Sequence, residues 1–299
     1  MRKDRLDGMG FSALVAVALL LAVNQIIVKE VNRGLQPVFF AGLRSALAVG
    51  FVWGWLRYRG LTGRLRRADL WPGLAMGALF AAEFLCLFIA LDLTAVSRAS
   101  VIFYSMPVWM GILGHFYLPG ERLNALRATG LLLSFLGTAL AILARPSGGG
   151  TQNLVGDLCA LGAAFGWAGT AFLARKTSLR EAGPEAQLLW MVAVSAPILL
   201  IVSVGVAGLG FGPLLREVTM THWALLLVQS AIVVAGGFVS WLWLLSVYPT
   251  ATVASFSFLT PLFALSMGVL FYGEDLSTGL AVAFLLVATG IILVNRKAS

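Results

Sequence analysis

The feature that most constrains this chain is a series of long apolar runs separated by short polar connections. A helix needs roughly 20 apolar residues to cross the hydrocarbon core of a bilayer. The sequence has ten such runs, at 11–28, 37–56, 71–91, 98–117, 124–143, 156–174, 185–206, 222–244, 253–271 and 278–294. The chain is 60% hydrophobic and 11% charged, whereas a soluble domain carries about 25% charged residues. We therefore predict an all-α membrane protein with ten transmembrane helices.

The basic residues predict how these helices are oriented. Cytoplasmic loops carry an excess of Lys and Arg. If the N-terminus is inside, the inner segments hold fifteen Lys and Arg residues and the outer segments hold five. This bias predicts that both termini are cytoplasmic. The first apolar run continues to Val28 without a small-residue cleavage site, so we interpret it as the first helix and not as a signal peptide.

The two halves of the sequence repeat each other. Leu91 precedes Pro107 by sixteen residues, and Leu245 precedes Pro261 by the same number. A Gly-Glu pair follows each proline, and a Lys-x3-Arg-x3-Pro pattern occurs at 29–37 and again at 176–184. We predict two five-helix repeats, 1–147 and 148–299, around a central cavity. Because five is odd, the second repeat is inverted, which is typical of secondary transporters.

Each repeat carries a proline inside its fourth apolar run, in "FYSMPVW" and "SFLTPLF". A proline inside a helix removes a backbone donor and displaces the carbonyl four residues earlier, here that of Phe103 or Ser257. A freed carbonyl persists in a membrane where protein or a wet cavity covers it. One proline alone indicates a packing kink. Two at matched positions favour broken helices that line a cavity, with Phe103, Pro107, Ser257 and Pro261 in its wall.

Two charged residues, Arg44 and Glu83, lie well inside apolar runs. Each costs on the order of 2.5–3.5 kcal/mol at the bilayer centre, so neither should face lipid. They form a static ion pair, or they bind the carboxylate and the amine of a zwitterionic substrate. Glu121 and Glu274 are interpreted as structural anions at helix starts. His115, near the end of its run, is interpreted as an interfacial residue.

Aromatic residues near the matched prolines or inside the apolar runs are further candidates for substrate contact. These are Tyr104, Trp167, Trp241 and Trp243. Most other aromatic residues are expected in the core or in the interfacial belts.

Glycines four residues apart predict close contacts between helices. Three such pairs occur, Gly50/Gly54, Gly73/Gly77 and Gly162/Gly166.

Several classes of function are disfavoured by what the sequence lacks. There is no Gly-x-Ser-x-Gly elbow, no His-Glu-x-x-His and no Walker phosphate loop, so we expect neither an enzyme nor an ATP-driven pump. The basic residues form no nucleic-acid-binding motif, and Cys86 and Cys159 form no metal or disulfide pattern. We expect no cofactor and no metal. A channel or a membrane scaffold remains as an alternative to a carrier.

The ten spans in two halves, the proline in the fourth helix of each half and the Gly-Glu that closes it resemble the drug/metabolite transporter superfamily. Within it the chain is most similar to the EamA-domain exporters, and among these to the YddG-type amino-acid exporters. The resemblance implies a monomer that exports a broad range of amino acids, including aromatic ones, across the cell inner membrane. Export of other small metabolites or drugs is the alternative. The "LLWG"-like motif of the family's first helix is "LLLAVNQ" here, and its tryptophan remains only as Trp167.

Overall fold

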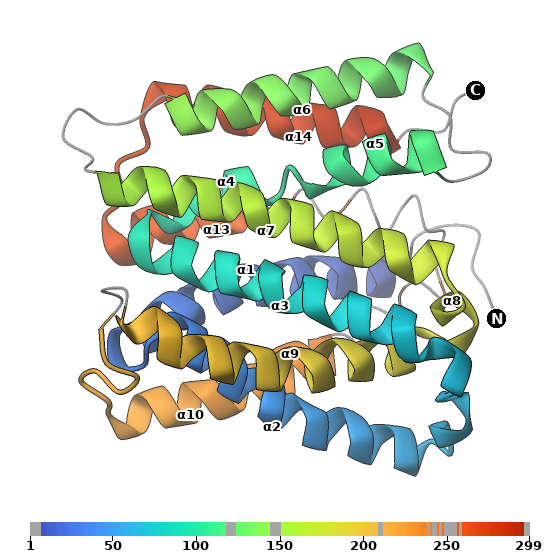
Figure 1. Cartoon of the computed structure of the whole chain (residues 1–299). Coiled ribbons are helices and arrows are strands. Elements are labelled where there is room, and N and C mark those ends of the chain that lie inside the picture. Colours follow the sequence, from blue (N-terminus) through green and yellow to red (C-terminus); the bar gives the residue numbers. More distant parts are fainter. Residues whose placement is uncertain are drawn as a thin grey trace.

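The computed structural model describes residues 7–117, 124–143, 151–208, 212–237, 240, 244, 247, 256 and 259–295. These residues form a bundle of helices that lie side by side (Figure 1). The elements are α1 (Gly8–Gly34), α2 (Pro37–Tyr58), the 3₁₀ turns η1 (Thr62–Arg64) and η2 (Arg67–Asp69), α3 (Leu70–Leu93), α4 (Val96–Phe103), α5 (Met106–Tyr117), α6 (Ala125–Leu143), α7 (Thr151–Lys176), α8 (Leu179–Ala182), α9 (Pro184–Val206), α10 (Met220–Val228), the π-helix η4 (Gln229–Gly237), α13 (Leu259–Tyr272) and α14 (Thr278–Asn295).

Eight helical segments are long and apolar enough to cross a membrane, which makes the chain a multi-pass membrane protein. They correspond to α1, α2, α3, α4 with α5, α6, α7, α9, and α10 with η4. The apolar helices α13 and α14 are shorter. The predicted span at 253–271 lies partly outside the described residues, so the total of ten remains a prediction.

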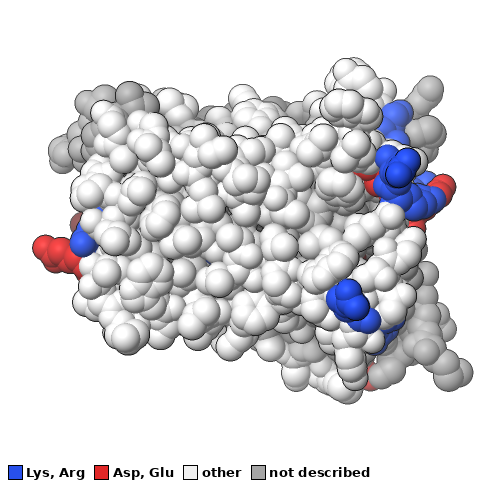
Figure 2. Space-filling view, turned by 60° about the horizontal axis from the view of Figure 1, so that its bottom comes forward, with Lys and Arg blue, Asp and Glu red and all other residues white. Residues whose placement is uncertain are grey.

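Charge is distributed along the bundle as a membrane protein requires. Figure 2 shows a broad band without charged residues between two charged ends. On the face shown, Lys and Arg gather mainly at the end where α1 begins and α14 ends, as comparison with Figure 1 shows. We call this end the terminal end, and the opposite one the distal end.

Polar side chains fix the starts of several helices. Asp7 accepts a first-turn N–H at the start of α1, and Gln36 does the same for α2, where Pro37 is the first residue. Proline suits that position because its missing N–H would have no partner inside the helix. At α10, Nδ1 of His222 accepts the N–H of Thr219 at 2.9 Å in a reciprocal capping arrangement. One of the two histidines is therefore structural.

Helix α2 packs extensively on α9, and the two run antiparallel. The Oγ of Ser195 donates to the Oγ of Ser45 at 3.1 Å. Further back along α2, a Cβ added at Gly42 would lie 3.0 Å from the backbone nitrogen of Leu200. Residue numbers therefore rise along α9 as they fall along α2.

Helices α6 and α14 also pack closely, and their contact is reciprocal. A Cβ added at Gly137 would lie 2.8 Å from the carbonyl oxygen of Ala283, and one added at Gly290 would meet the carbonyl of Gly130. Gly290 follows Gly137 by 153 residues, and the other two residues are separated by the same number. A reciprocal contact of this kind is what two-fold symmetry produces. The pairing also makes these two helices antiparallel.

The predicted glycine contacts are confirmed in two places and wrong in one. Gly73/Gly77 packs closely against Trp190 and Val194 of α9, and Gly162/Gly166 packs against α3. A Cβ added at Gly50/Gly54 would meet no described residue within 4 Å. Both of these glycines are exposed on α2, so they lie on an outer face of the bundle.

Candidate functional site

Arg44 lies in α2 and is 2% exposed. Its guanidinium carbon is 3.7 Å from the ring centroid of Phe84 and 5.5 Å from that of Phe88. A cation over an aromatic face is stabilised by the ring quadrupole, and more so away from water. Three phenylalanines spaced along α3, Phe80, Phe84 and Phe88, supply this environment. The helix pair α2 and α3 thus holds a cation inside the bundle.

Glu83 lies in α3 and is also 2% exposed. Helix α7 crosses α3 at this point, and a Cβ added at Gly166 would lie 2.9 Å from the Cα of Glu83. Only a glycine allows the two backbones to approach this closely. The carboxylate is therefore enclosed by the packing of two helices, one from each half of the sequence.

Arg44 and Glu83 interact electrostatically, but their hydrogen-bonding capacity is largely unused. Among the described residues, the Nε and Nη2 of Arg44 and the Oε2 of Glu83 have no hydrogen-bond partner. A buried polar atom without a partner is costly, and nearly all such atoms are paired in folded proteins. A ligand that carries both an anionic and a cationic group would supply the partners that these atoms lack.

The helix break predicted at Pro107 is present. Helix α4 ends at Phe103, α5 begins at Met106, and Pro107 is the second residue of α5. The Oγ of Ser105, within the break, donates to the carbonyl of Ile102 at 2.7 Å. The break therefore follows from proline chemistry, with a hydroxyl satisfying a carbonyl near the end of α4.

Tyr104 connects this break to two other helices. Its hydroxyl lies near the side chains of Gln25 in α1 and Thr260 in α13. Thr260 immediately precedes Pro261, which is buried in the first turn of α13. The regions around the two matched prolines therefore meet next to α1. Phe103 is also buried, with its ring centroid 5.3 Å from that of Tyr104.

The remaining predicted residues lie in other parts of the described structure or outside it. Trp167 is half-buried in α7 and packs against the main hydrophobic core. Trp241, Trp243 and Ser257 lie outside the described residues. His115 is half-buried near the end of α5, with its ring centroid 4.9 Å from that of Phe116.

Buried amides were missed by the sequence analysis. The Nε2 of Gln229 donates to the Oδ1 of Asn24 at 2.9 Å, and the Oε1 of Gln229 has no partner within the described part of the chain. Gln229 opens the π-helix η4, a type of segment that often occurs at functional sites. The available signal was an amide inside an apolar run, in "AVNQIIV" and in "LVQSAIV".

The side chains of Cys86 in α3 and Cys159 in α7 lie near each other where the two helices pack. Both are free thiols. Within the described ranges, no three His, Cys, Asp or Glu side chains are grouped so that they could hold a metal ion.

Comparison with known proteins identifies the family. The model of the EamA-like transporter family matches the chain twice, at residues 8–143 and 154–296. The chain is 29% identical to the uncharacterized transporter YvbV of Bacillus subtilis (strain 168), over 95% of this chain and 90% of that protein. It is 22% identical to the uncharacterized transporter YoaV of the same organism, over 94% of each. A solved crystal structure shares the fold, with a TM-score of 0.63, 19% identity and coverage of 94% of this chain and 96% of the other. The chain therefore belongs to the EamA-like transporter family.

Proposed function

We propose that this transporter is a secondary exporter of amino acids that works by alternating access. Two five-helix halves, 1–147 and 148–299, rock around a central site in the inner membrane, with both termini in the cytoplasm. The family model matches once in each half, which supports a duplicated architecture. As a transporter of this family, the chain moves a substrate and is not an enzyme.

The helix contacts support an inverted relation between the halves. Helices α2 and α9 are the second spans of their halves, and α6 and α14 are the fifth. Each of these pairs runs antiparallel, as repeats of opposite orientation require. An inverted pair of repeats can exchange conformations, so that a site between them opens first to one side and then to the other.

The observation that carries the proposed substrate is the buried and unpartnered pair of charges. An amino acid brings a carboxylate for Arg44 and an amine for Glu83, and so satisfies atoms that the protein leaves open. The rings around Arg44 favour substrates with aromatic side chains. We place Phe103, Tyr104, Pro107, Trp167, Trp241, Ser257 and Pro261 in the wall of the same transport pathway.

Export of other small metabolites or drugs is the second candidate function. The ligands of the two candidate functions differ in charge. A ligand with a single charged group leaves either Arg44 or Glu83 without a partner. Chemical analogues of one amino acid therefore separate the two candidates.

The test is binding of phenylalanine, its amide and its N-acetyl derivative to the purified protein. We expect the wild type to prefer the zwitterion over both analogues. Arg44→Gln should lose discrimination against the amide, whose carboxylate is missing. Glu83→Gln should lose discrimination against the N-acetyl derivative, whose amine is neutral. Arg57→Gln, which removes an exposed arginine from the same helix, is the matched control. Equal binding of all three compounds by the wild type would overturn the zwitterion assignment.

A further inference from the structure

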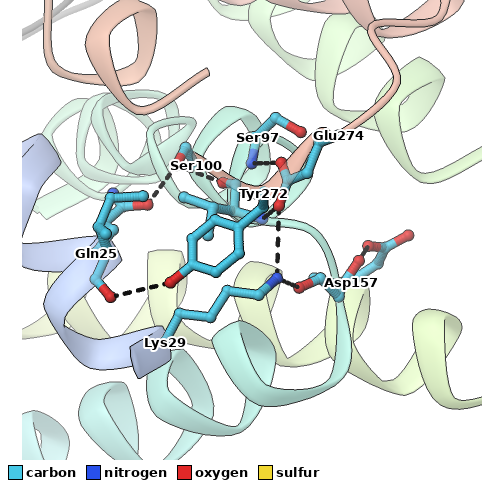
Figure 3. Close-up of polar contacts among 10 residues, drawn as sticks. Gln25, Lys29, Ser97, Ser100, Asp157, Tyr272 and Glu274 are labelled. Atoms are coloured by element: carbon cyan, nitrogen blue, oxygen red, sulfur yellow. Dashed lines mark hydrogen bonds and ion pairs between the residues drawn. The ribbon is translucent and has the colours of Figure 1, made fainter. Parts of the chain in front are cut away.

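The distal end of the bundle is held together by contacts between the two halves of the sequence. Figure 3 shows the side chains of Lys29 from α1 and Glu274 from the connection after α13 meeting at the start of α4. The Nζ of Lys29 lies 3.5 Å from the Oε1 of Glu274 and donates to the carbonyl of Thr94 at 3.1 Å. It also lies 5.1 Å from the ring centroid of Tyr272.

The main role of the Glu274 carboxylate is to cap α4. The N–H of Val96 donates to its Oε1 at 2.7 Å, and the N–H of Ser97 donates to its Oε2 at 2.9 Å. These are two of the first-turn donors that a helix cannot satisfy itself, and a carboxylate is the acceptor that the helix dipole favours. The cap comes from the other half of the sequence, 178 residues away.

The preceding glycine allows this geometry. Gly273 has a φ of +61°, a conformation that other residues rarely adopt. The chain reverses there, so the N–H of Glu274 donates to the carbonyl of Gly268 at 3.2 Å and its side chain turns back toward α4. Gly268 leaves room for the carboxyl group, because a Cβ there would lie 3.0 Å from its Cδ.

A second set of contacts braces the same start of α4 from the other side. The Oδ2 of Asp157 in α7 lies 2.7 Å from Nη2 of Arg98, and its Oδ1 accepts the hydroxyl of Thr94 at 2.9 Å. Arg98 also donates to the carbonyl of Ala141 in α6 at 2.5 Å. These contacts join α4 to α6 and α7. On the opposite side α13 packs directly against α4, and Glu274, just after the end of α13, adds the hydrogen bonds that cap α4.

We propose that Glu274 is a gate residue whose cap on α4 holds the distal end closed, and that the cap is released when this end opens. The inference rests on the proposed alternating access, because opening between the halves at this end separates the connection after α13 from α1 and α4. Below the cap, Ser100 of α4 and Gln25 of α1 are hydrogen-bonded and buried, and the Gln25 side chain also lies near the hydroxyl of Tyr104. Release of Glu274 therefore exposes the polar pathway toward the helix break.

The test measures exposure of Ser100 and needs no substrate. In the full chain with Cys86→Ala and Cys159→Ala, a Ser100→Cys reporter is treated with a membrane-impermeant thiol reagent added from the distal side of sealed vesicles. We expect Glu274→Gln to speed the modification about tenfold, the shift in population that losing one charge-assisted hydrogen bond gives. Asp275→Asn, which removes an exposed acid next in sequence, should leave the rate unchanged.

A charge exchange separates the cap from the ion pair. The double change Lys29→Glu with Glu274→Lys restores opposite charges, but a lysine cannot accept the N–H groups of Val96 and Ser97. We expect thiol modification of the reporter to stay fast in this variant. A return to the slow wild-type rate, or a wild-type rate in Glu274→Gln, would overturn the role of the cap. If size-exclusion chromatography shows that Glu274→Gln does not fold, the same measurement is made on Glu274→Asp, whose side chain is one methylene shorter, with the same expected results.

The test of the gate and the test of the proposed function can fail independently of each other. A fast reporter in Glu274→Gln supports the gate whatever the substrate proves to be. A slow reporter, together with normal amino-acid flux in the same variant, removes the gate and leaves the transport proposal standing.

Discussion

A single methyl group on α7 should disturb the candidate site through the backbone of α3. In Gly166→Ala the new Cβ would lie 2.9 Å from both the Cα and the Cβ of Glu83 and 3.1 Å from its backbone nitrogen. None of these atoms can rotate away, so the two helices must separate. Forcing a methyl group into a packed interior costs about 1–3 kcal/mol. The displaced residue is the one we expect to bind the substrate amine.

The steric cost of Gly166→Ala is measured by comparison with Gly54→Ala, which adds the same methyl group on the exposed face of α2. Both changes gain about 0.5–1 kcal/mol because alanine favours a helix more than glycine does. A Cβ at Gly54 meets no described residue within 4 Å, so only Gly166→Ala carries the steric cost. The difference between the two variants should therefore be the full packing term, about 1–3 kcal/mol.

The assay is apparent thermal stability in detergent, together with binding of phenylalanine. We expect Gly54→Ala to melt at or above the wild-type temperature and Gly166→Ala to melt several degrees below Gly54→Ala, with weaker binding. Equal melting temperatures for the two alanine variants would refute the close approach of α7 to Glu83.

Three further changes test other parts of the structure. Pro107→Ala and Pro261→Ala should insert normally but transport more slowly, as measured by flux in vesicles, because each favours a continuous helix; wild-type flux in both would leave the prolines as packing kinks. If Arg44 and Glu83 act only as a static ion pair, Glu83→Gln should destabilise the protein by about 3 kcal/mol, and adding Arg44→Met should restore the protein level on an immunoblot; if Glu83 binds the substrate amine, Glu83→Gln should instead fold normally and lose affinity for zwitterions. A reporter that is active only in the periplasm should give no signal when fused to Ser299, whereas activity would show that the span count is wrong by one.

The features that the sequence predicted well are those that depend on local chemistry. An apolar run of sufficient length forms a membrane helix wherever it packs, and eight segments qualify by both length and composition. The break before Pro107 was also predictable, since the proline ring acts on the carbonyl four residues back. The burial of Arg44 and Glu83 followed from the cost of exposing charge to lipid.

The features that the sequence could not predict depend on which helices meet. An anion at a helix start was expected at Glu274, but the helix it caps is α4 and not the one that follows it in sequence. Its counterpart Glu121 lies outside the described residues. The spacing of Gly50/Gly54 is the same as that of Gly162/Gly166, yet only the second pair meets a partner helix. Spacing describes one face of one helix, and the neighbour is set by the whole bundle.

Counterflow in proteoliposomes is the most direct test of transport by alternating access. The purified protein is reconstituted, loaded with unlabelled phenylalanine and exposed to a trace of labelled phenylalanine, with and without a pH gradient. An alternating-access carrier predicts saturable uptake that is accelerated by the internal substrate and is lost in Glu83→Gln but not in Arg57→Gln. Uptake that rises linearly with concentration and does not depend on the internal substrate would contradict alternating access.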